Sequence, residues 1–370
     1  MSEQVKPIQK ILFGSPGTGK SYQVREIAKS DLHIPFDEDT KTLRNTIKTV
    51  FHPEYTYADF MGKLLPLTQG GSVIYKFYPG HFLRILGMAY KALIDGSQEN
   101  FLLVIDELNR GNAAAIFGTV FQLLDRESDG WSSYEVDISD MELFGLLSAM
   151  GLNPIIQQNG SIDIDDNGAK MSYKRYFENK ANISKADNFE SFRICSILKK
   201  CQIKIPTNLS IIATINTSDE SIYYLDSAFK RRWDWEYVDS PSENSSPVPS
   251  ELKEVKLMSG DQEKELWQNY VIGINKFITS NYQSIRRIED KQIGWWFIKP
   301  EGNVVELQQV KDKLMFHLWD SVFARDKKPL EELLSTQKNS PVKLRQYSDF
   351  LGLTDDFMEE VLKFLDDIAF

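Results

Sequence analysis

Short apolar runs alternate with longer mixed segments through residues 8–240 of this sequence. The runs lie at residues 11–13, 47–51, 101–105 and 209–215. Mostly apolar runs of this length are typical of strands that are buried on both faces. Because the segments between them are long enough for helices, the pattern predicts an α/β domain with a parallel sheet flanked by helices.

The pattern changes after residue 239, where Ser and Pro become frequent up to residue 250. This composition predicts a linker, which we place at residues 241–261. Residues 262–370 show helical spacing of apolar residues and are expected to form a helical lid or C-terminal domain. The residues that carry this spacing are Leu266, Tyr270, Ile274, Phe277 and Ile278, followed by Leu314, Leu318 and Val322.

Residues 131–204 do not fit the alternation and are interpreted as an insertion in the α/β domain, with no fold assigned to it. Their acidic segment 161–168 is expected to form a solvated hairpin turn.

The composition limits which binding partners and which cellular compartment we expect for this protein. The net charge of −10 argues against a broad basic face for nucleic acid. The charged residues 1–6 do not resemble a signal peptide, and no apolar run is long enough to span a membrane. Two cysteines, Cys195 and Cys201, do not make a disulfide framework, so we expect a cytoplasmic protein.

A complete phosphate-binding loop follows the first apolar run. It consists of Gly14, Ser15, Pro16, Gly17, Thr18, Gly19, Lys20 and Ser21. The residues before it predict a strand, and those after it, beginning with Tyr22, predict a helix. This context favours a nucleoside triphosphate site over a chance glycine-rich turn. Lys20 is expected to reach the β- and γ-phosphates, and the Ser21 hydroxyl to ligate Mg²⁺.

The run at residues 101–105 ends in two acids, Asp106 and Glu107. Ligands bind at the carboxyl ends of parallel strands, where these side chains are expected to lie. We predict that Asp106 holds Mg²⁺ and that Glu107 polarises the attacking water. The alternative is a core strand followed by two solvated acids.

Further polar residues follow the run at 209–215. Asn216 is placed to hold water near the γ-phosphate, and Asp219 lies on the same loop, although a turn-forming Asn is an alternative. Arg231 and Arg232 come next. Arginines stabilise the charge that develops on a transferring phosphoryl group and are often supplied by a neighbouring subunit, the alternative being a solvated basic patch.

The sequence resembles the AAA+ superfamily and, within it, the McrB-like NTPase subunits of methylcytosine-specific restriction systems. The motifs that carry the resemblance are FGSPGTGKS (13–21), FHPEYTYADF (51–60), YPGHFLRI (78–85), LVIDELNRGNAAAIFG (103–118), IPTNLSIIATINTSDES (205–221) and LDSAFKRRWDW (225–235). They cover most of residues 8–240 outside the insertion. A weaker match, Gln292-Ile293-Gly294, lies in the helical part.

The resemblance implies a five-stranded parallel sheet with a helical lid, assembled as a ring, expected to be hexameric. The nucleotide, GTP or ATP with Mg²⁺, then lies between subunits, with Arg231 or Arg232 reaching into the neighbour's site. Members of this family power a separate nuclease subunit, which is McrC-like in the founding type. Where the family signature has Arg, this sequence has Glu220, a reversal expected to affect hydrolysis or coupling to the nuclease.

The resemblance therefore predicts an NTP-hydrolysing motor of a restriction or anti-phage system. Better-known members carry an N-terminal DNA-reading domain, whereas this sequence starts at the motor, so we expect DNA contact through the insertion or a partner. A protein-remodelling ATPase of the MoxR or dynein-related type is the alternative, and a nucleotide-gated scaffold with little hydrolysis is a third reading.

Overall fold

The computed structural model describes residues 5–366 except residue 167 and residues 185–187, 218–222 and 243–247. The chain divides into two compact units. The first unit comprises Met1–Leu12, Ser21–Ile215 and Ser221–Glu236. The second comprises Phe13–Lys20, Asn216–Glu220 and Tyr237–Phe370, so the phosphate-binding loop belongs to it.

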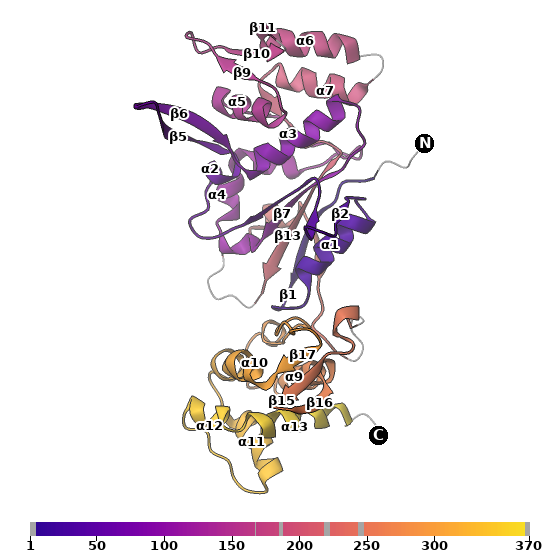
Figure 1. Cartoon of the computed structure of the whole chain (residues 1–370), viewed down its shortest axis with the longest axis vertical. Helices are drawn as coiled ribbons and strands as arrows, with labels where there is room; N and C mark the ends of the chain where they lie inside the picture. The colour runs from indigo at the N-terminus through magenta and orange to yellow at the C-terminus, as the bar shows by residue number, and fades with distance from the viewer. Residues whose placement is uncertain (1–4, 167, 185–187, 218–222, 243–247, 367–370) are drawn as a thin grey trace. The chain divides into compact units, whose positions relative to one another are not determined.

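A five-stranded sheet has the order β14-β1-β13-β7-β4 (Figure 1). Its strands are β1 (Gln9–Gly14), β4 (Thr46–Val50), β7 (Phe101–Asp106), β13 (Leu209–Asn216) and β14 (Asp234–Tyr237). The inner strand β7 pairs in parallel with both β13 and β4. Residues 101–105 are all buried, as expected for apolar side chains covered on both faces. The predicted α/β fold with a parallel sheet flanked by helices is confirmed.

Helices lie in the segments that connect these strands along the chain. The helices are α1 (Lys20–Ser30), α2 (Tyr57–Phe60), α3 (His81–Ile94), α4 (Ala113–Phe117) and α8 (Ser227–Lys230). Helix α3 packs against β4 and β7 through a continuous set of buried apolar residues. Two hairpins lie between the helices: β2 (Phe36–Asp37) with β3 (Thr42–Leu43), and β5 (Gly62–Gln69) with β6 (Ser72–Pro79). Figure 1 shows the β5–β6 hairpin extending beyond α2.

The insertion forms helices and small antiparallel sheets. Helices α5 (Asp140–Ala149) and α7 (Phe189–Leu198) pack against α3, and α6 (Tyr173–Ser184) packs against α7. Strands β8 (Val136–Asp137) and β12 (Gln202–Ile203) pair with each other. Strands β9 (Pro154–Ile156), β10 (Ile162–Asp166) and β11 (Ala169–Ser172) form a three-stranded sheet. Because β10 and β11 pair antiparallel, the acidic segment 161–168 lies in a hairpin, but residues 162–166 form its first strand rather than the expected solvated turn.

The C-terminal part of the second unit is mostly helical around a small sheet of order β16-β15-β17. The strands are β15 (Lys256–Ser259), β16 (Gln262–Leu266) and β17 (Val304–Glu306). The helices are α9 (Trp267–Ser280), α10 (Leu307–Gln309), α11 (Lys328–Lys338), α12 (Tyr347–Leu351) and α13 (Thr354–Asp366), with π-helical segments at Val310–Met315 and His317–Val322.

Two structural features of this unit differ from what the sequence pattern predicts. Helical structure begins at Trp267 rather than at residue 262, because Gln262–Leu266 pairs with β15 in a hairpin. Within the segment 241–261, expected to be a linker, Leu252 and Val255 are 0% exposed and belong to the hydrophobic core of the second unit. Among the described residues, no helix is both long enough and apolar enough to cross a membrane.

Asn275 of α9 is a buried polar anchor, with 2% of its surface exposed. Its Nδ2 donates to the carbonyls of Pro241, at 2.9 Å, and Ile293, at 2.8 Å. Its Oδ1 accepts from the backbone N–H of Ile293 at 2.8 Å. One side chain therefore satisfies backbone groups of two segments, which would otherwise be buried without partners.

Replacing Asn275 with Ala is expected to lower the free energy of unfolding by about 2–4 kcal/mol, since buried backbone groups lose their partners. Asn269→Ala is the matched control on the same helix, because Asn269 is only partly buried and donates to the side chain of Glu265. It is expected to cost less than about 0.5 kcal/mol. Urea unfolding followed by circular dichroism measures both; equal losses would contradict an anchoring role for Asn275.

Candidate functional site

The phosphate-binding loop joins the end of β1 to the start of α1 through glycines in unusual backbone conformations. Gly17 and Gly19 have φ angles of 76° and 93°, which side-chain-bearing residues rarely adopt. The turn therefore needs glycine at both positions. A helix N-terminus follows it directly, which supplies unpaired N–H groups suited to phosphate.

Lys20 and Thr18 hold the loop together from inside. Lys20 is 7% exposed, and its Nζ donates to the carbonyls of Gly14, at 2.9 Å, and Ser15, at 2.7 Å. Thr18 Oγ1 also donates to the Ser15 carbonyl, at 3.0 Å. The ammonium group that is expected to bind phosphate is thus already positioned at the loop.

Backbone hydrogen bonds join the loop to the segment around Gly294 in the second unit. The Gly294 N–H donates to the Pro16 carbonyl at 3.1 Å, and the Trp296 N–H donates to the Gly17 carbonyl at 2.9 Å. A Cβ atom at Gly294 would lie 1.9 Å from the Gly17 carbonyl carbon, so no side chain fits there. The weak sequence match at Gln292-Ile293-Gly294 pointed to this segment but did not reveal its contact with the loop.

The Ser15 side chain also joins the loop to other segments of the second unit. Its hydroxyl donates to the Glu289 carbonyl and accepts from the Ser240 hydroxyl at 3.2 Å. The loop is therefore held by several segments of the second unit.

The carboxyl end of β7 places Asp106 among residues of its two neighbouring strands. Asp106 Oδ1 accepts from Thr214 Oγ1 of β13 at 3.1 Å, and Asp106 Oδ2 lies 2.6 Å from Lys48 Nζ of β4. The Glu107 N–H donates to Thr214 Oγ1 at 3.3 Å, and Glu107 has a φ of 56°. This left-handed conformation turns the chain sharply at the end of the strand.

Sequence reasoning missed both Lys48 and Thr214. Thr214 lies in a mostly apolar strand and is 5% exposed, and a polar side chain in such a strand is a signal that could have been used.

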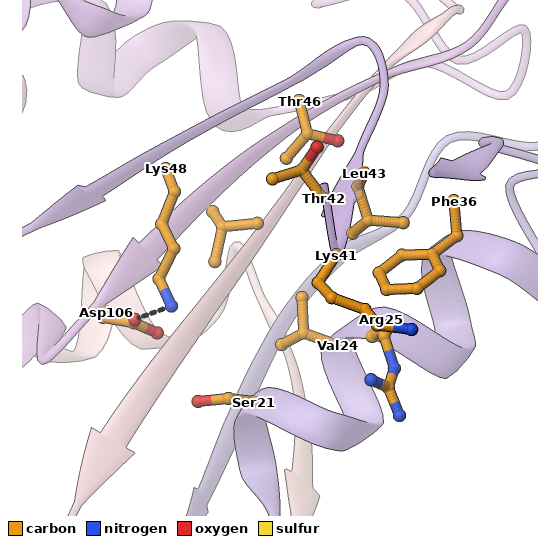
Figure 2. A pocket seen from close by; sticks show the side chains of 11 residues that line it. Ser21, Val24, Arg25, Phe36, Lys41, Thr42, Leu43, Thr46, Lys48 and Asp106 are labelled. Atoms are coloured by element: carbon orange, nitrogen blue, oxygen red, sulfur yellow. Dashed lines mark ion pairs between the residues drawn. The ribbon is translucent and has the colours of Figure 1, made fainter. Parts of the chain in front are cut away.

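Ser21 and Asp106 line one cavity of about 320 Å³ (Figure 2). Figure 2 shows Ser21 at the start of α1 and Asp106, joined to Lys48, at the end of β7. The other lining residues are Val24, Arg25, Phe36, Lys41, Thr42, Leu43, Thr46 and Val104. A hydroxyl and a carboxylate that face the same cavity are oxygen ligands suited to Mg²⁺, which binds few protein ligands alongside phosphates. The predicted metal residues therefore fit the ion.

Asn216 is the last residue of β13, and the N–H of the next residue, Thr217, donates to the Gly14 carbonyl at 3.4 Å. The end of this strand therefore lies beside the start of the phosphate-binding loop. Asp219 and Glu220 lie outside the described residues.

The two adjacent arginines differ in their surroundings. The Arg232 side chain is 8% exposed, lies 2.6 Å from Asp125 Oδ2 and stacks over the Phe121 ring at 4.0 Å from its centroid. Arg231 is exposed and makes no ion pair with a described residue. Burial therefore makes Arg232 part of the packing of the chain itself and leaves Arg231 at the surface, a distinction that the sequence left open.

Together, the strand order, the glycine loop with its lysine and the paired acids after an inner strand are the features of an α/β P-loop fold of the AAA+ kind. Comparison with known proteins identifies relatives of this chain. No protein-family model matches the chain. The sequence is 28% identical over 340 residues to the type II restriction enzyme BsuMI component YdiS of Bacillus subtilis strain 168, covering 86% of this chain and 80% of YdiS.

A second relative is the type IV methyl-directed restriction enzyme EcoKMcrB subunit of Escherichia coli K12. It is 28% identical over 124 residues, which are 33% of this chain and 24% of that protein. These two matches confirm the resemblance to the McrB-like AAA+ NTPases.

Solved structures with detectable likeness include a protein from Cytophaga hutchinsonii described as an ATPase and PCH-2 of C. elegans. The first is 13% identical, with a TM-score of 0.26, and covers 96% of this chain and 84% of that chain. The second is 12% identical, with a TM-score of 0.23, and covers 96% of this chain and 62% of that chain. Likeness at these TM-scores carries no argument, and the fold rests on the observed strand order and loop.

Gly294→Ala is expected to weaken triphosphate binding at least about tenfold, because the added methyl group must displace the backbone of Gly17. A fluorescent, non-hydrolysable triphosphate measures the affinity. Gly352→Ala is the matched control in the same unit, because its backbone is right-handed and a Cβ there meets nothing closer than 3.4 Å. Wild-type affinity in Gly294→Ala, with the control also unaffected, would show that the loop does not depend on this contact.

Proposed function

We propose that this protein is the NTP-hydrolysing ring motor of a McrBC-like restriction system that defends against foreign DNA and drives a separate nuclease subunit on that DNA. The observation that carries the proposal is the similarity to the BsuMI component YdiS along 86% of the chain, combined with a complete phosphate-binding loop. GTP and ATP are both candidate substrates, since the loop recognises phosphates rather than the base.

In the proposed reaction, residues 14–22 bind the triphosphate, with Lys20 against its β- and γ-phosphates. Ser21 and Asp106 would hold Mg²⁺, which neutralises charge on the phosphates when bound. Glu107 would take the proton of the attacking water, and Asn216 and Asp219 would orient that water.

We further propose that Arg231 acts on the nucleotide of a neighbouring subunit in a ring, expected to be hexameric. Its exposure supports this assignment, because a residue that acts across a subunit boundary must be accessible. Arg232 would instead stabilise the subunit that contains it through its pair with Asp125.

Glu107→Gln tests the motor function. It is expected to keep triphosphate affinity and to lower turnover by at least about a hundredfold, because the amide cannot accept the water proton. GTP and ATP turnover are measured side by side, alone and with DNA and an McrC-like nuclease subunit. The proposal fails if the wild type hydrolyses neither triphosphate under any of these conditions, or if Glu107→Gln leaves turnover unchanged.

Arg231→Ala tests the intersubunit site. Turnover is expected to fall about a thousandfold with little loss of nucleotide binding or thermal stability. Arg232→Ala is expected to lower the free energy of unfolding by about 3 kcal/mol, since Asp125 then loses its partner. Mixing Arg231→Ala with Glu107→Gln subunits should restore partial turnover. No recovery in mixed assemblies would argue against action across a subunit boundary.

A further inference from the structure

The parallel pairing of β4 with β7 brings Lys48 to the predicted metal ligand Asp106. In the register of these strands Lys48 is opposite Val104, two residues before Asp106. The Lys48 Nζ reaches Asp106 Oδ2 at 2.6 Å, while the Thr214 hydroxyl donates to Oδ1 at 3.1 Å. Both oxygens of the carboxylate are therefore engaged by neighbouring strands. Figure 2 shows the ion pair with Lys48.

Lys48 differs in its pairing from the other two cations that line the cavity. Arg25 lies 3.5 Å from Glu26 Oε1, and Lys41 lies 3.0 Å from Glu38 Oε2. Both of these pairs are formed with nearby residues of the same segment, outside the lining of the cavity. Lys48 instead pairs with the carboxylate that lines the cavity itself.

Burial indicates which partner of this pair is able to move. The Asp106 side chain is 16% exposed and is fixed by the Thr214 hydroxyl, whereas the Lys48 side chain is 54% exposed. A flexible, half-exposed lysine can turn into solvent at little cost, because exposed ion pairs contribute little to stability.

A divalent cation and an ammonium group compete for the same carboxylate oxygen. With Mg²⁺ at Asp106, an ammonium group 2.6 Å from Oδ2 would be repelled by a double positive charge. A metal bound at Oδ2 would therefore displace the lysine from that oxygen.

We propose that Lys48 is a positioning residue that neutralises and holds Asp106 until Mg²⁺ replaces it, and that this exchange sets the Mg²⁺ concentration the protein requires. This inference rests on the proposed triphosphatase function and adds a competitor for the metal ligand. It assigns a role to a residue that lies outside the glycine loop and the acidic pair.

The test is a binding measurement rather than turnover. A fluorescent, non-hydrolysable triphosphate is titrated with MgCl₂ against wild type and Lys48→Met. The variant is expected to reach half-saturation at about two- to fivefold lower Mg²⁺, the range that corresponds to an exposed ion pair. Lys48→Arg should remain near the wild type, because it keeps a cation at Asp106.

Lys41→Met is the matched control, since it removes the same charge at the rim of the cavity but leaves the pair of Lys48 with Asp106 intact. Its Mg²⁺ requirement should change less than that of Lys48→Met. Lys48→Gln provides a second neutral variant if Lys48→Met does not fold. An unchanged or higher Mg²⁺ requirement in the folded neutral variant, or an equal change in Lys41→Met, overturns the inference. A wild type that binds no triphosphate at any Mg²⁺ concentration would instead refute the proposed function.

Discussion

The parallel pairing of β7 with a strand on each side is the constraint on which the catalytic end of the sheet depends. Its register places Ile105 opposite Ala213 of β13 and Thr49 of β4. Asp106 therefore follows at a point where Thr214 and Lys48 both reach its carboxylate. Successive side chains alternate between faces, so a slip of one residue would turn Asp106 away from both. Burial of residues 101–105 fixes that register, because a slipped apolar strand has no equivalent set of neighbours.

The phosphate-binding loop depends on a different constraint, the close approach of backbone to backbone. A Cβ at Gly294 would meet the backbone of Gly17, a Cβ at Gly17 would meet the backbone of Phe297, and two hydrogen bonds join the two segments. Asn275 bonds both backbone groups of Ile293, the residue before Gly294. The buried amide of Asn275 thus helps to position the segment that contains Gly294. That segment in turn bonds the carbonyls of Pro16 and Gly17.

The sequence was sufficient where chemistry is confined to a short stretch of chain. The glycine loop, the acids after a buried strand and the sheet itself could be predicted, because each depends on neighbouring residues and on an apolar run. Lys48 and Gly294 could not be predicted, since their importance arises from partners 58 and 277 positions away, Asp106 and Gly17. The strand at residues 262–266, at the start of the part expected to be helical, also depends on distant pairing, because it forms a hairpin with β15.

The different roles proposed for Arg231 and Arg232 also depend on contacts between residues that are distant in the sequence. Both arginines have the same charge and adjacent positions, so only the fold distinguishes them. Arg232 is 8% exposed and pairs with Asp125, 107 positions earlier, and breaking such a pair would leave a partly buried charge without a partner. Lys48 also pairs across the fold, but its side chain is 54% exposed and can be hydrated when the pair opens. Two ion pairs of the same length, 2.6 Å, therefore have different uses, since burial makes one a fixed part of the fold and exposure leaves the other free to exchange its partner.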